Sequence, residues 1–148
     1  MKVVKVDYAD NCDFQSWIDL LELVKESFPG LDLKEYKNVL HQSILNQEAL
    51  IAKNDKGELV GELIFSRKNC ELAFLAIHPR HRKKGIATNL IQHMFDLFPK
   101  GTNLKVITYR EGDVKGIAAR KLYQSIGFIE GKFITVFNYP CQELNYII

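Results

Sequence analysis

The sequence predicts a mixed α/β domain arranged around a largely antiparallel sheet. The first observation is a series of three short strand-like stretches within residues 49–77, separated by turn sequences, as in an antiparallel meander. The second is helical spacing of apolar residues in two segments before this series and two after it. The third is a sequence without repeats, low-complexity stretches or linkers, from which we expect a single domain over residues 1–148.

The N-terminal half predicts one strand and two helices ahead of the three strands. The pair Pro29-Gly30 ends the first helix. Asp32 caps the second helix, because Glu35 follows it at capping-box spacing. We therefore expect a strand over residues 2–7, a helix from Asn11 or Asp13 to about residue 28, a helix over residues 32–47, and strands over residues 49–53, 58–66 and 70–77.

The C-terminal half alternates helices with strands. Ile86, Leu90 and Ile91 begin an apolar helical face, whereas Leu104 and Val106 lie two residues apart, as in a strand. We expect a helix over residues 86–98, a strand over 104–108, a helix over 116–126, a strand over 128–138 and a further strand over 143–148.

The composition excludes several classes of protein. Hydrophobic residues make up 47% and charged residues 26%, and the net charge of +2 is too small to predict binding to nucleic acid or a membrane. Asp7 interrupts any apolar N-terminal region, so we expect no signal peptide. The three cysteines show no C-x-x-C spacing, which predicts a reducing cytoplasm and neither a disulfide framework nor a metal site.

The most informative stretch is a basic turn between a strand and a helix, at residues 78–91. An apolar strand precedes it, and Gly85 lies where the turn becomes the helix. The first N–H groups of a helix have no partner within the helix and carry a partial positive charge. Four basic residues add to it: Arg80, Arg82, Lys83 and Lys84. This arrangement favours a phosphate or a pyrophosphate.

Two motifs resemble those of the GNAT superfamily of N-acetyltransferases. Residues 82–87, Arg-Lys-Lys-Gly-Ile-Ala, match its R-x-x-G-x-G/A signature, and Ile77-His78-Pro79 matches the usual lead-in. Residues 116–128 resemble its N-x-x-A-x-x-L-Y-x-x-x-G-F element at every marked position except the first, where Gly116 replaces Asn. The resemblance is close from Glu58 to about Phe137. It implies the GNAT fold, with a mixed, mostly antiparallel sheet of six to seven strands and about four helices.

The resemblance implies acetyl-CoA as the acetyl donor and assigns residues to it. The strand before the signature binds the pantetheine arm, the turn binds the pyrophosphate, and the second motif lies beside the coenzyme. The coenzyme contacts are Leu75, Ala76, Ile77, Arg82, Lys83, Lys84, Gly85, Ile86, Ala87, Thr88, Gly116, Ala119 and Tyr123. Glycine at position 116 has no side chain for the contact that Asn makes in the family.

The implied reaction is direct acetyl transfer to a primary amine. Tyr123 is the general acid for the departing thiolate, since a phenol can donate a proton to it. A backbone N–H near Ile77 polarises the thioester carbonyl. The general base is open. Glu111, in the loop after the fifth strand, is favoured because loops at strand ends often carry function, and the other candidates are Glu62, Glu71 and Asp113.

The acceptor is a small molecule or a peptide or protein amine, and a homodimer is compatible with the fold. By resemblance, the acceptor site involves residues 27–32 and 139–142, with Trp17, Phe28, Tyr36 and Phe137 as candidates for its lining or for the core. The alternative is a catalytically weak, acyl-CoA-binding sensor or partner domain. A P-loop enzyme is excluded, since the sequence has no G-x-x-x-x-G-K-[ST] motif, and no aromatic platform for nucleic acid accompanies the basic run.

Overall fold

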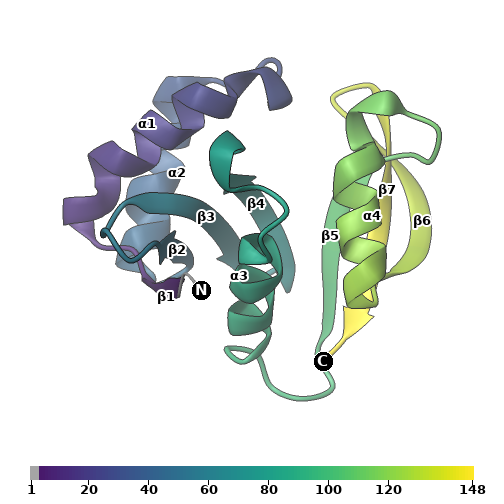
Figure 1. The fold of residues 1–148 in the computed structure, drawn as a ribbon. Helices are drawn as coiled ribbons and strands as arrows, with labels where there is room; N and C mark the ends of the chain where they lie inside the picture. Colours follow the sequence, from purple (N-terminus) through teal and green to yellow (C-terminus); the bar gives the residue numbers. More distant parts are fainter. Residues whose placement is uncertain (1–3) are drawn as a thin grey trace. The chain divides into compact units, whose positions relative to one another are not determined.

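A computed structural model describes residues 4–148 of the chain, which form two compact units (Figure 1). Unit 1 comprises Met1–Phe65 and Phe74–Leu97, and unit 2 comprises Ser66–Ala73 and Phe98–Ile148. The single domain that we expect over residues 1–148 stays a prediction. None of the helices in the described residues has the length and apolar character needed to cross a membrane.

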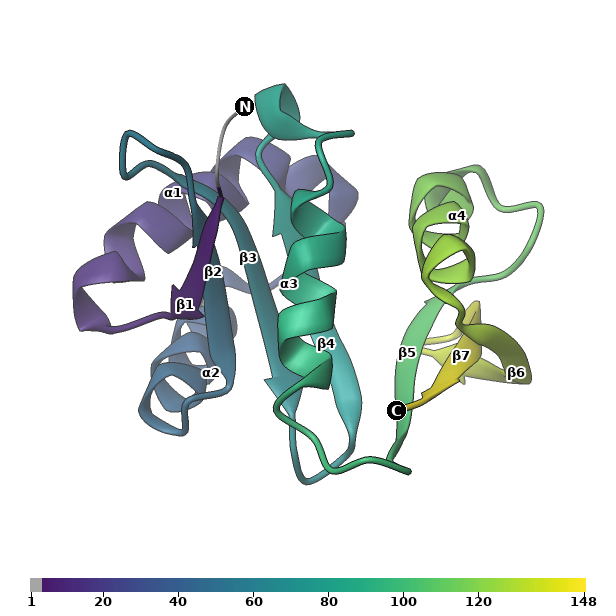
Figure 2. The ribbon, with the colours of Figure 1, turned by 60° about the horizontal axis from the view of Figure 1, so that its bottom comes forward.

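Unit 1 has helices on both faces of its strands (Figures 1 and 2). Strand β1 pairs antiparallel with β2, and β2 pairs antiparallel with β3, as the turn sequences predict. Helices α1 and α2 pack on one face, and α3 covers the other. The elements are β1 (Lys5–Tyr8), η1 (Asn11–Asp13), α1 (Phe14–Val24), η2 (Lys25–Ser27), α2 (Leu33–Leu45), β2 (Ala49–Lys53), β3 (Leu59–Ser66), β4 (Glu71–Ile77), η3 (Pro79–His81) and α3 (Ile86–Phe95).

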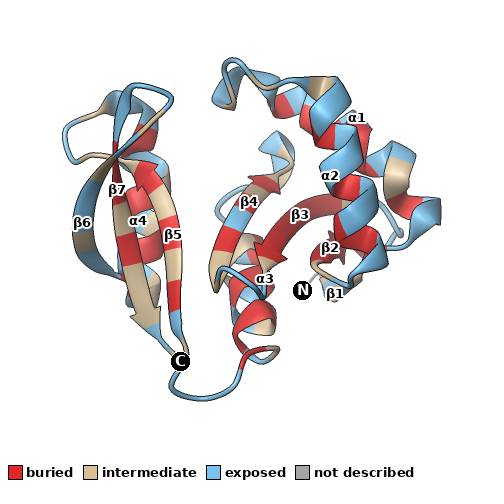
Figure 3. Ribbon diagram, turned by 180° about the vertical axis from the view of Figure 1, so that it is seen from behind, coloured by how far each residue is buried: buried red, intermediate tan, exposed pale blue. Residues whose placement is uncertain are grey.

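The core of unit 1 lies between β2–β4 and the helix pair α1 and α2. Strand β3 is buried along almost its whole length (Figure 3). Trp17 of α1 and Leu40 of α2 are fully buried against this face. On the opposite face, a Cβ atom at Gly61 would lie 2.9 Å from Ile86 and 3.0 Å from Leu90, so α3 packs directly on the strand there. Burial of these apolar side chains is the main force that holds unit 1 together.

The structure confirms the predicted cap of the second helix and corrects the predicted cap of the first. Asp32 caps α2, because its side chain accepts from Lys34 N at 3.0 Å and Glu35 N at 3.3 Å. For the first helix we expected Asn11 or Asp13 as the cap. Asp13 stands at the N-cap position of α1, but its side chain makes no capping hydrogen bond there. Asp10 is the capping residue of η1, and it exchanges capping-box hydrogen bonds with Asp13 before α1 begins. The expected strand over residues 2–7 is β1, and its residues 2 and 3 lie outside the described part.

Unit 2 is a small sheet with one helix packed on it. Strand β7 pairs antiparallel with both β5 and β6, and α4 covers one face (Figure 2). The start of β4 pairs in parallel with β5 at Glu71↔Lys105 and Leu72↔Val106. The remaining elements are β5 (Asn103–Tyr109), η4 (Val114–Gly116), α4 (Ile117–Ile126), β6 (Ile129–Val136) and β7 (Tyr139–Ile147).

Strand β7 begins earlier than the sequence predicts. We expected residues 139–142 to lie outside a strand, but Tyr139 opens β7 directly after a two-residue turn. Phe137 (φ 47°) and Asn138 (φ 62°) both have left-handed backbones, as in the hairpin turns that match strand twist. Pro140 lies opposite Thr135 of β6 and is tolerated because pairing of β7 with β5 begins only at Cys141.

The strand order β1-β2-β3-β4-β5-β7-β6 gives a seven-stranded, mostly antiparallel sheet. With the four α-helices of the described residues, this is the fold class that the two motifs predict.

Candidate active site

The basic turn after β4 has a defined backbone. His78 N–H donates to Val60 O of β3 at 2.8 Å, and His78 Nδ1 accepts from Arg80 N at 3.1 Å. These bonds hold the short helix η3 at the end of β4. Two residues then adopt left-handed conformations, Lys83 at φ 62° and Gly85 at φ 80°. Glycine adopts this conformation without strain, which explains its place in the signature.

The turn leaves the start of α3 open. Gly85 is the N-cap residue and offers no side-chain cap, and the first turn of the helix contains no acidic residue. The first helical bond is Asn89 N to Gly85 O at 3.0 Å, so the N–H groups of Ile86, Ala87 and Thr88 precede the hydrogen-bonded ladder. Buried Ile86 and Leu90 fix the helix to the sheet. The contrast with α2, which Asp32 caps, indicates that α3 has an N-terminus suited to an anion.

The sequence-predicted coenzyme residues of unit 1 form one continuous segment. Leu75 and Ile77 are half-buried and Ala76 is buried in β4, while Arg82, Lys83 and Lys84 are exposed in the turn. The structure therefore brings a strand end, a basic turn and an open helix start together, as the signature predicts. Arg82 has an extended backbone, which directs the chain from η3 into the left-handed residues.

The second motif lies in unit 2, where Tyr123 is buried on α4. Its side chain is 6% exposed, and its ring packs at 5.6 Å from the ring of Phe128. Burial raises the pKa of Tyr123 to about 12, so the phenol keeps its proton at neutral pH. Tyr123 can therefore serve as a proton donor, and the same packing gives it a structural role in the helix.

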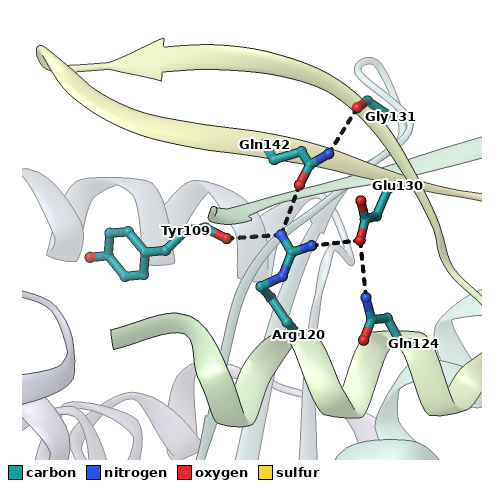
Figure 4. Close-up of polar contacts among 6 residues, drawn as sticks. All are labelled: Tyr109, Arg120, Gln124, Glu130, Gly131 and Gln142. Atoms are coloured by element: carbon teal, nitrogen blue, oxygen red, sulfur yellow. Dashed lines mark hydrogen bonds and ion pairs between the residues drawn. The ribbon is translucent and has the colours of Figure 1, made fainter. Parts of the chain in front are cut away.

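A buried arginine anchors the helix that carries Tyr123 (Figure 4). Arg120 is 5% exposed and donates to Tyr109 O at 3.0 Å, Gln142 Oε1 at 2.9 Å and Glu130 Oε1 at 3.0 Å. Gln142 Nε2 in turn donates to Gly131 O at 3.0 Å. One guanidinium thus joins α4 to β5, β6 and β7. No sequence pattern predicts this role, and only the position of Arg120, three residues before Tyr123, links it to the motif.

The structure explains why glycine stands at position 116. Gly116 is buried at the start of α4, and a Cβ atom there would lie 2.8 Å from Tyr109 Cβ and 3.5 Å from Tyr109 O. Its φ of −102° is open to any residue, so the backbone does not require glycine here. Glycine is required because no space is left for a side chain. Ala119 is half-buried on the next turn of the helix. The Asn of the family motif would not fit here without a shift of α4 from β5.

The candidate general bases have very different surroundings. Glu111 is exposed in the turn after β5. Asp113 accepts from Lys115 N and from the Tyr139 hydroxyl at 2.6 Å, and this hydroxyl holds the pKa of Asp113 below its usual value. Burial raises the pKa of Glu71. Glu62 is 0% exposed, and burial raises its pKa to about 10.

The residues considered for the acceptor site separate into core and surface. Trp17 is fully buried and donates to the Tyr36 hydroxyl at 2.7 Å, so both belong to the core of unit 1. Phe137 is 99% exposed at the β6–β7 turn, and residues 139–142 are part of β7. Phe28 lines a surface hollow at the α1–α2 connection, together with Leu21, Glu22, Lys25, Pro29, Gly30, Leu31 and Leu33.

Comparison with known families agrees with this architecture. A sequence model of the acetyltransferase (GNAT) family matches residues 17–128. This range includes both motifs and most of the chain, so the protein belongs to the GNAT acetyltransferase family. A search of curated protein sequences returned no match.

Solved structures share the fold at low sequence identity. A GNAT acetyltransferase from Bacillus cereus has a TM-score of 0.77 at 19% identity, and the match covers 98% of this chain and 97% of that one. Arabidopsis thaliana Naa50, in complex with the bisubstrate analogue CoA-Ac-MVNAL, has a TM-score of 0.73 at 17% identity, over 98% and 99% of the two chains. The Escherichia coli ribosomal-protein-S18-alanine N-acetyltransferase has a TM-score of 0.69 at 14% identity, over 97% and 91%.

Proposed function

We propose that this protein is an acetyl-CoA-dependent N-acetyltransferase that moves the acetyl group directly to a primary amine. The observation that carries the proposal is the open N-terminus of α3 behind the basic, left-handed turn at Lys83 and Gly85. Backbone N–H groups in this setting bind phosphate oxygens, and exposed lysines and arginines add a screened, weaker attraction. Membership of the GNAT acetyltransferase family supports the same chemistry.

In this proposal the coenzyme is held by the segment from Leu75 to Thr88. The pyrophosphate lies on the N–H groups of the turn and of the start of α3, and the Thr88 hydroxyl adds a donor. The pantetheine amides bind the backbone of Leu75, Ala76 and Ile77, which follow the two residues of β4 that pair with β5. Gly116 and Ala119 are the proposed contacts from the second motif. Gly116 can contribute only its backbone.

The chain's own groups supply the acid for the leaving thiolate. Tyr123 donates a proton to the sulfur, a role that its raised pKa supports because the phenol stays protonated until it is needed. A backbone N–H near Ile77 stabilises the oxyanion that forms at the thioester carbonyl. Glu111 remains the base that the sequence favours. Because it is exposed in a turn, we propose that it takes the amine proton through water rather than by direct contact.

The acceptor is an amine on a small molecule, a peptide or a protein. One structural neighbour is in complex with the bisubstrate analogue CoA-Ac-MVNAL, and another is named for the alanine of a ribosomal protein, so peptide N-termini belong among the test substrates. Two further parts of the proposal come from the sequence: a location in the cytoplasm, and possible assembly as a homodimer.

The test is chromatographic detection of CoA released from acetyl-CoA across a panel of amines and peptides. We expect amine-dependent release, reduced at least tenfold (about 1.4 kcal/mol of barrier) in Tyr123→Phe. Tyr8→Phe, in β1, is the matched control and should keep full activity. Undiminished release in Tyr123→Phe removes the acid role. Tight acetyl-CoA binding without release by any amine favours the alternative, an acyl-CoA-binding sensor domain.

A further inference from the structure

His78 holds the short helix η3 through three hydrogen bonds. Its N–H donates to Val60 O of β3 at 2.8 Å, and its carbonyl oxygen accepts from His81 N at 2.9 Å. Its side chain caps η3, because Nδ1 accepts from Arg80 N at 3.1 Å. Pro79 has no N–H, so Arg80 N is the first donor of η3 that needs a partner. One residue thus fixes η3 to the sheet and satisfies its first N–H group.

The side-chain bond defines the protonation state of the His78 ring. Nδ1 accepts a hydrogen bond only when it carries no proton, so the neutral ring has its proton on Nε2. A protonated ring has a hydrogen on both nitrogens and can only donate. In that state the Nδ1–H of His78 and the N–H of Arg80 would face each other, and the cap would be lost. Because histidine ordinarily titrates between about pH 5 and 8, the cap is a bond that acid can break.

The conformation of the coenzyme turn, residues 82–85, depends on what holds its two ends. Lys83 has φ 62° in this turn, a left-handed conformation that residues other than glycine disfavour. Such a residue keeps its conformation only where the surrounding structure holds the chain. Buried Ile86 and Leu90 fix the end that enters α3. The other end leaves η3, so its position depends on the bonds of His78.

The charged and titratable groups around the His78 ring come from η3 and from the turn that leads into β3. They are Lys56, Glu58, Arg80 and His81. The His81 ring meets the His78 ring edge-on at 5.2 Å. The Asn54 amide, and then the charges of Lys56, His81 and His78, lower the pKa of Glu58. Glu58 is therefore a carboxylate throughout the range in which imidazole titrates, and it favours the protonated rings, which the cationic side chains oppose.

We propose that the neutral His78 ring holds the coenzyme turn in the conformation that binds acetyl-CoA, and that protonation of His78 loosens the turn and weakens this binding. His78 is then a positioning residue, which acts through η3 on the N–H groups that meet the pyrophosphate. A turn that is ordered for only part of the time binds with an affinity reduced by that fraction. This inference rests on the proposed acetyl-CoA-dependent function and makes its coenzyme binding depend on pH.

The cap and the charge of His78 predict opposite effects of acid. A new positive charge beside the basic turn would attract the pyrophosphate and strengthen binding, whereas loss of the cap weakens it. Attraction between exposed charges is screened by salt, so measurements at about 0.5 M salt isolate the cap. The phosphate monoester of coenzyme A also gains a proton near about pH 6. All variants share this effect, and a comparison between variants cancels it.

The first test is NMR of the protein with ¹⁵N-labelled histidine, without coenzyme. At about pH 7.5 the neutral His78 ring should carry its proton on Nε2 and none on Nδ1. As the pH falls, the amide signal of Arg80 should shift with the same midpoint as the His78 ring. A neutral ring with its proton on Nδ1, or an Arg80 amide that does not follow the titration of the ring, would overturn the proposal.

The second test is calorimetric titration with acetyl-CoA at about pH 7.5 and about pH 5.5, in about 0.5 M salt. Acid should weaken binding by the native protein about two- to fivefold more than binding by His78→Asn, because Asn accepts the same capping bond and does not titrate. His78→Ala should bind at both pH values as weakly as the native protein does in acid. The control is His81→Asn, which should keep the native dependence on pH.

The outcomes separate this inference from the proposed function. An equal effect of pH on the native protein and on His78→Asn overturns the inference and leaves the function standing. Weak binding by His78→Asn at both pH values also overturns it, since an Asn cap should restore what His78→Ala loses. If the native protein binds no acetyl-CoA at either pH, the proposed function fails and the inference fails with it.

Discussion

Glu62 makes stability depend on pH in an unusual direction. Burial raises the pKa of Glu62 from its ordinary value of 4.5 to about 10, so between these pH values the folded state holds a proton that the unfolded chain releases. Stability therefore falls as pH rises through this window and levels off above it. We predict a contribution of up to about 1.4 kcal/mol per pH unit to the decrease in the free energy of unfolding, measured by urea denaturation.

Two variants serve as controls for that pH dependence. Glu62→Gln should remove this contribution, and Glu62→Leu should in addition raise the free energy of unfolding at neutral pH by about 1–3 kcal/mol, because it removes an unsatisfied polar group. Equal pH profiles in the native protein and Glu62→Gln would show that the carboxyl is not buried in solution.

The close packing of Gly116 against Tyr109 predicts that any side chain at position 116 destabilises the fold. Gly116→Ala should destabilise the protein by about 1–3 kcal/mol, because its Cβ would lie 2.8 Å from Tyr109 Cβ and must push α4 from β5. Chemical denaturation measures the loss. Lys121→Ala, at an exposed position of the same helix, is the control and should change the free energy of unfolding by less than about 0.5 kcal/mol. A neutral Gly116→Ala would contradict the contact.

These residues mark the limit of what the sequence predicts. Gly85 and Asp32 act through neighbours in the chain, so local patterns predicted their conformations. The roles of Glu62 and Gly116 depend on which distant segments pack against them, since burial by α2 and contact with β5 are tertiary. A strand residue such as Glu62 carries no local sign of complete burial.

At the scale of elements, α4 depends on Arg120. The guanidinium satisfies a backbone carbonyl of β5 and the side chains of Gln142 and Glu130, and it has no substitute with the same planar fork. Arg120→Met should cost about 3–5 kcal/mol, because it leaves buried acceptors without a donor. The urea midpoint and amide exchange in β7 measure the effect.

The control for this anchor is Glu130→Gln, whose side chain in the ion pair is 45% exposed. It should cost less than about 1 kcal/mol, since solvent can replace the partner. If Arg120→Met and Glu130→Gln cost the same, the ion pair would outweigh the buried bonds to Tyr109 and Gln142, contrary to the structure.

Two variants in the turn before α3 test separately how much the backbone N–H groups and the basic side chains contribute to acetyl-CoA binding. Gly85→Ala places a side chain in a left-handed conformation, at a cost of roughly 1–2 kcal/mol, and should weaken acetyl-CoA binding about tenfold by moving the N–H groups. Lys84→Ala should weaken it only a few-fold, and this difference should vanish at about 0.5 M salt. Calorimetric titration at two salt concentrations measures both. A larger loss in Lys84→Ala at both concentrations would contradict the role of the backbone.

Most elements follow from local patterns, and the exceptions have physical causes. Strand β2 has the predicted bounds, and α2, β3 and β5 begin and end within one or two residues of prediction. The start of β7 was missed because Phe137 and Asn138 form a turn in left-handed conformations that Phe seldom adopts. Pro140 also disguised the strand, and proline is accepted there because pairing with β5 begins only at Cys141, one residue later.

At the scale of the whole molecule, the two motifs lie in different compact units. The signature that begins at Arg82 is in unit 1, and the motif that contains Tyr123 is in unit 2. Membership of the GNAT acetyltransferase family rests on the sequence match over residues 17–128, and the solved structures support the fold. The sequence could predict the family because its two motifs have fixed spacing. The identity of the acceptor depends on side chains from segments without a motif, so the sequence could not predict it.

The central claim is that the acetyl group moves from coenzyme A to an amine nitrogen. The most direct measurement is ¹³C NMR of acetyl-CoA labelled at the acetyl carbonyl, mixed with the protein and a panel of amines and peptides. We predict that the thioester carbonyl signal is replaced by an amide carbonyl signal only when protein and acceptor are both present. A thioester signal that persists with every amine, or that turns into free acetate, would contradict the claim.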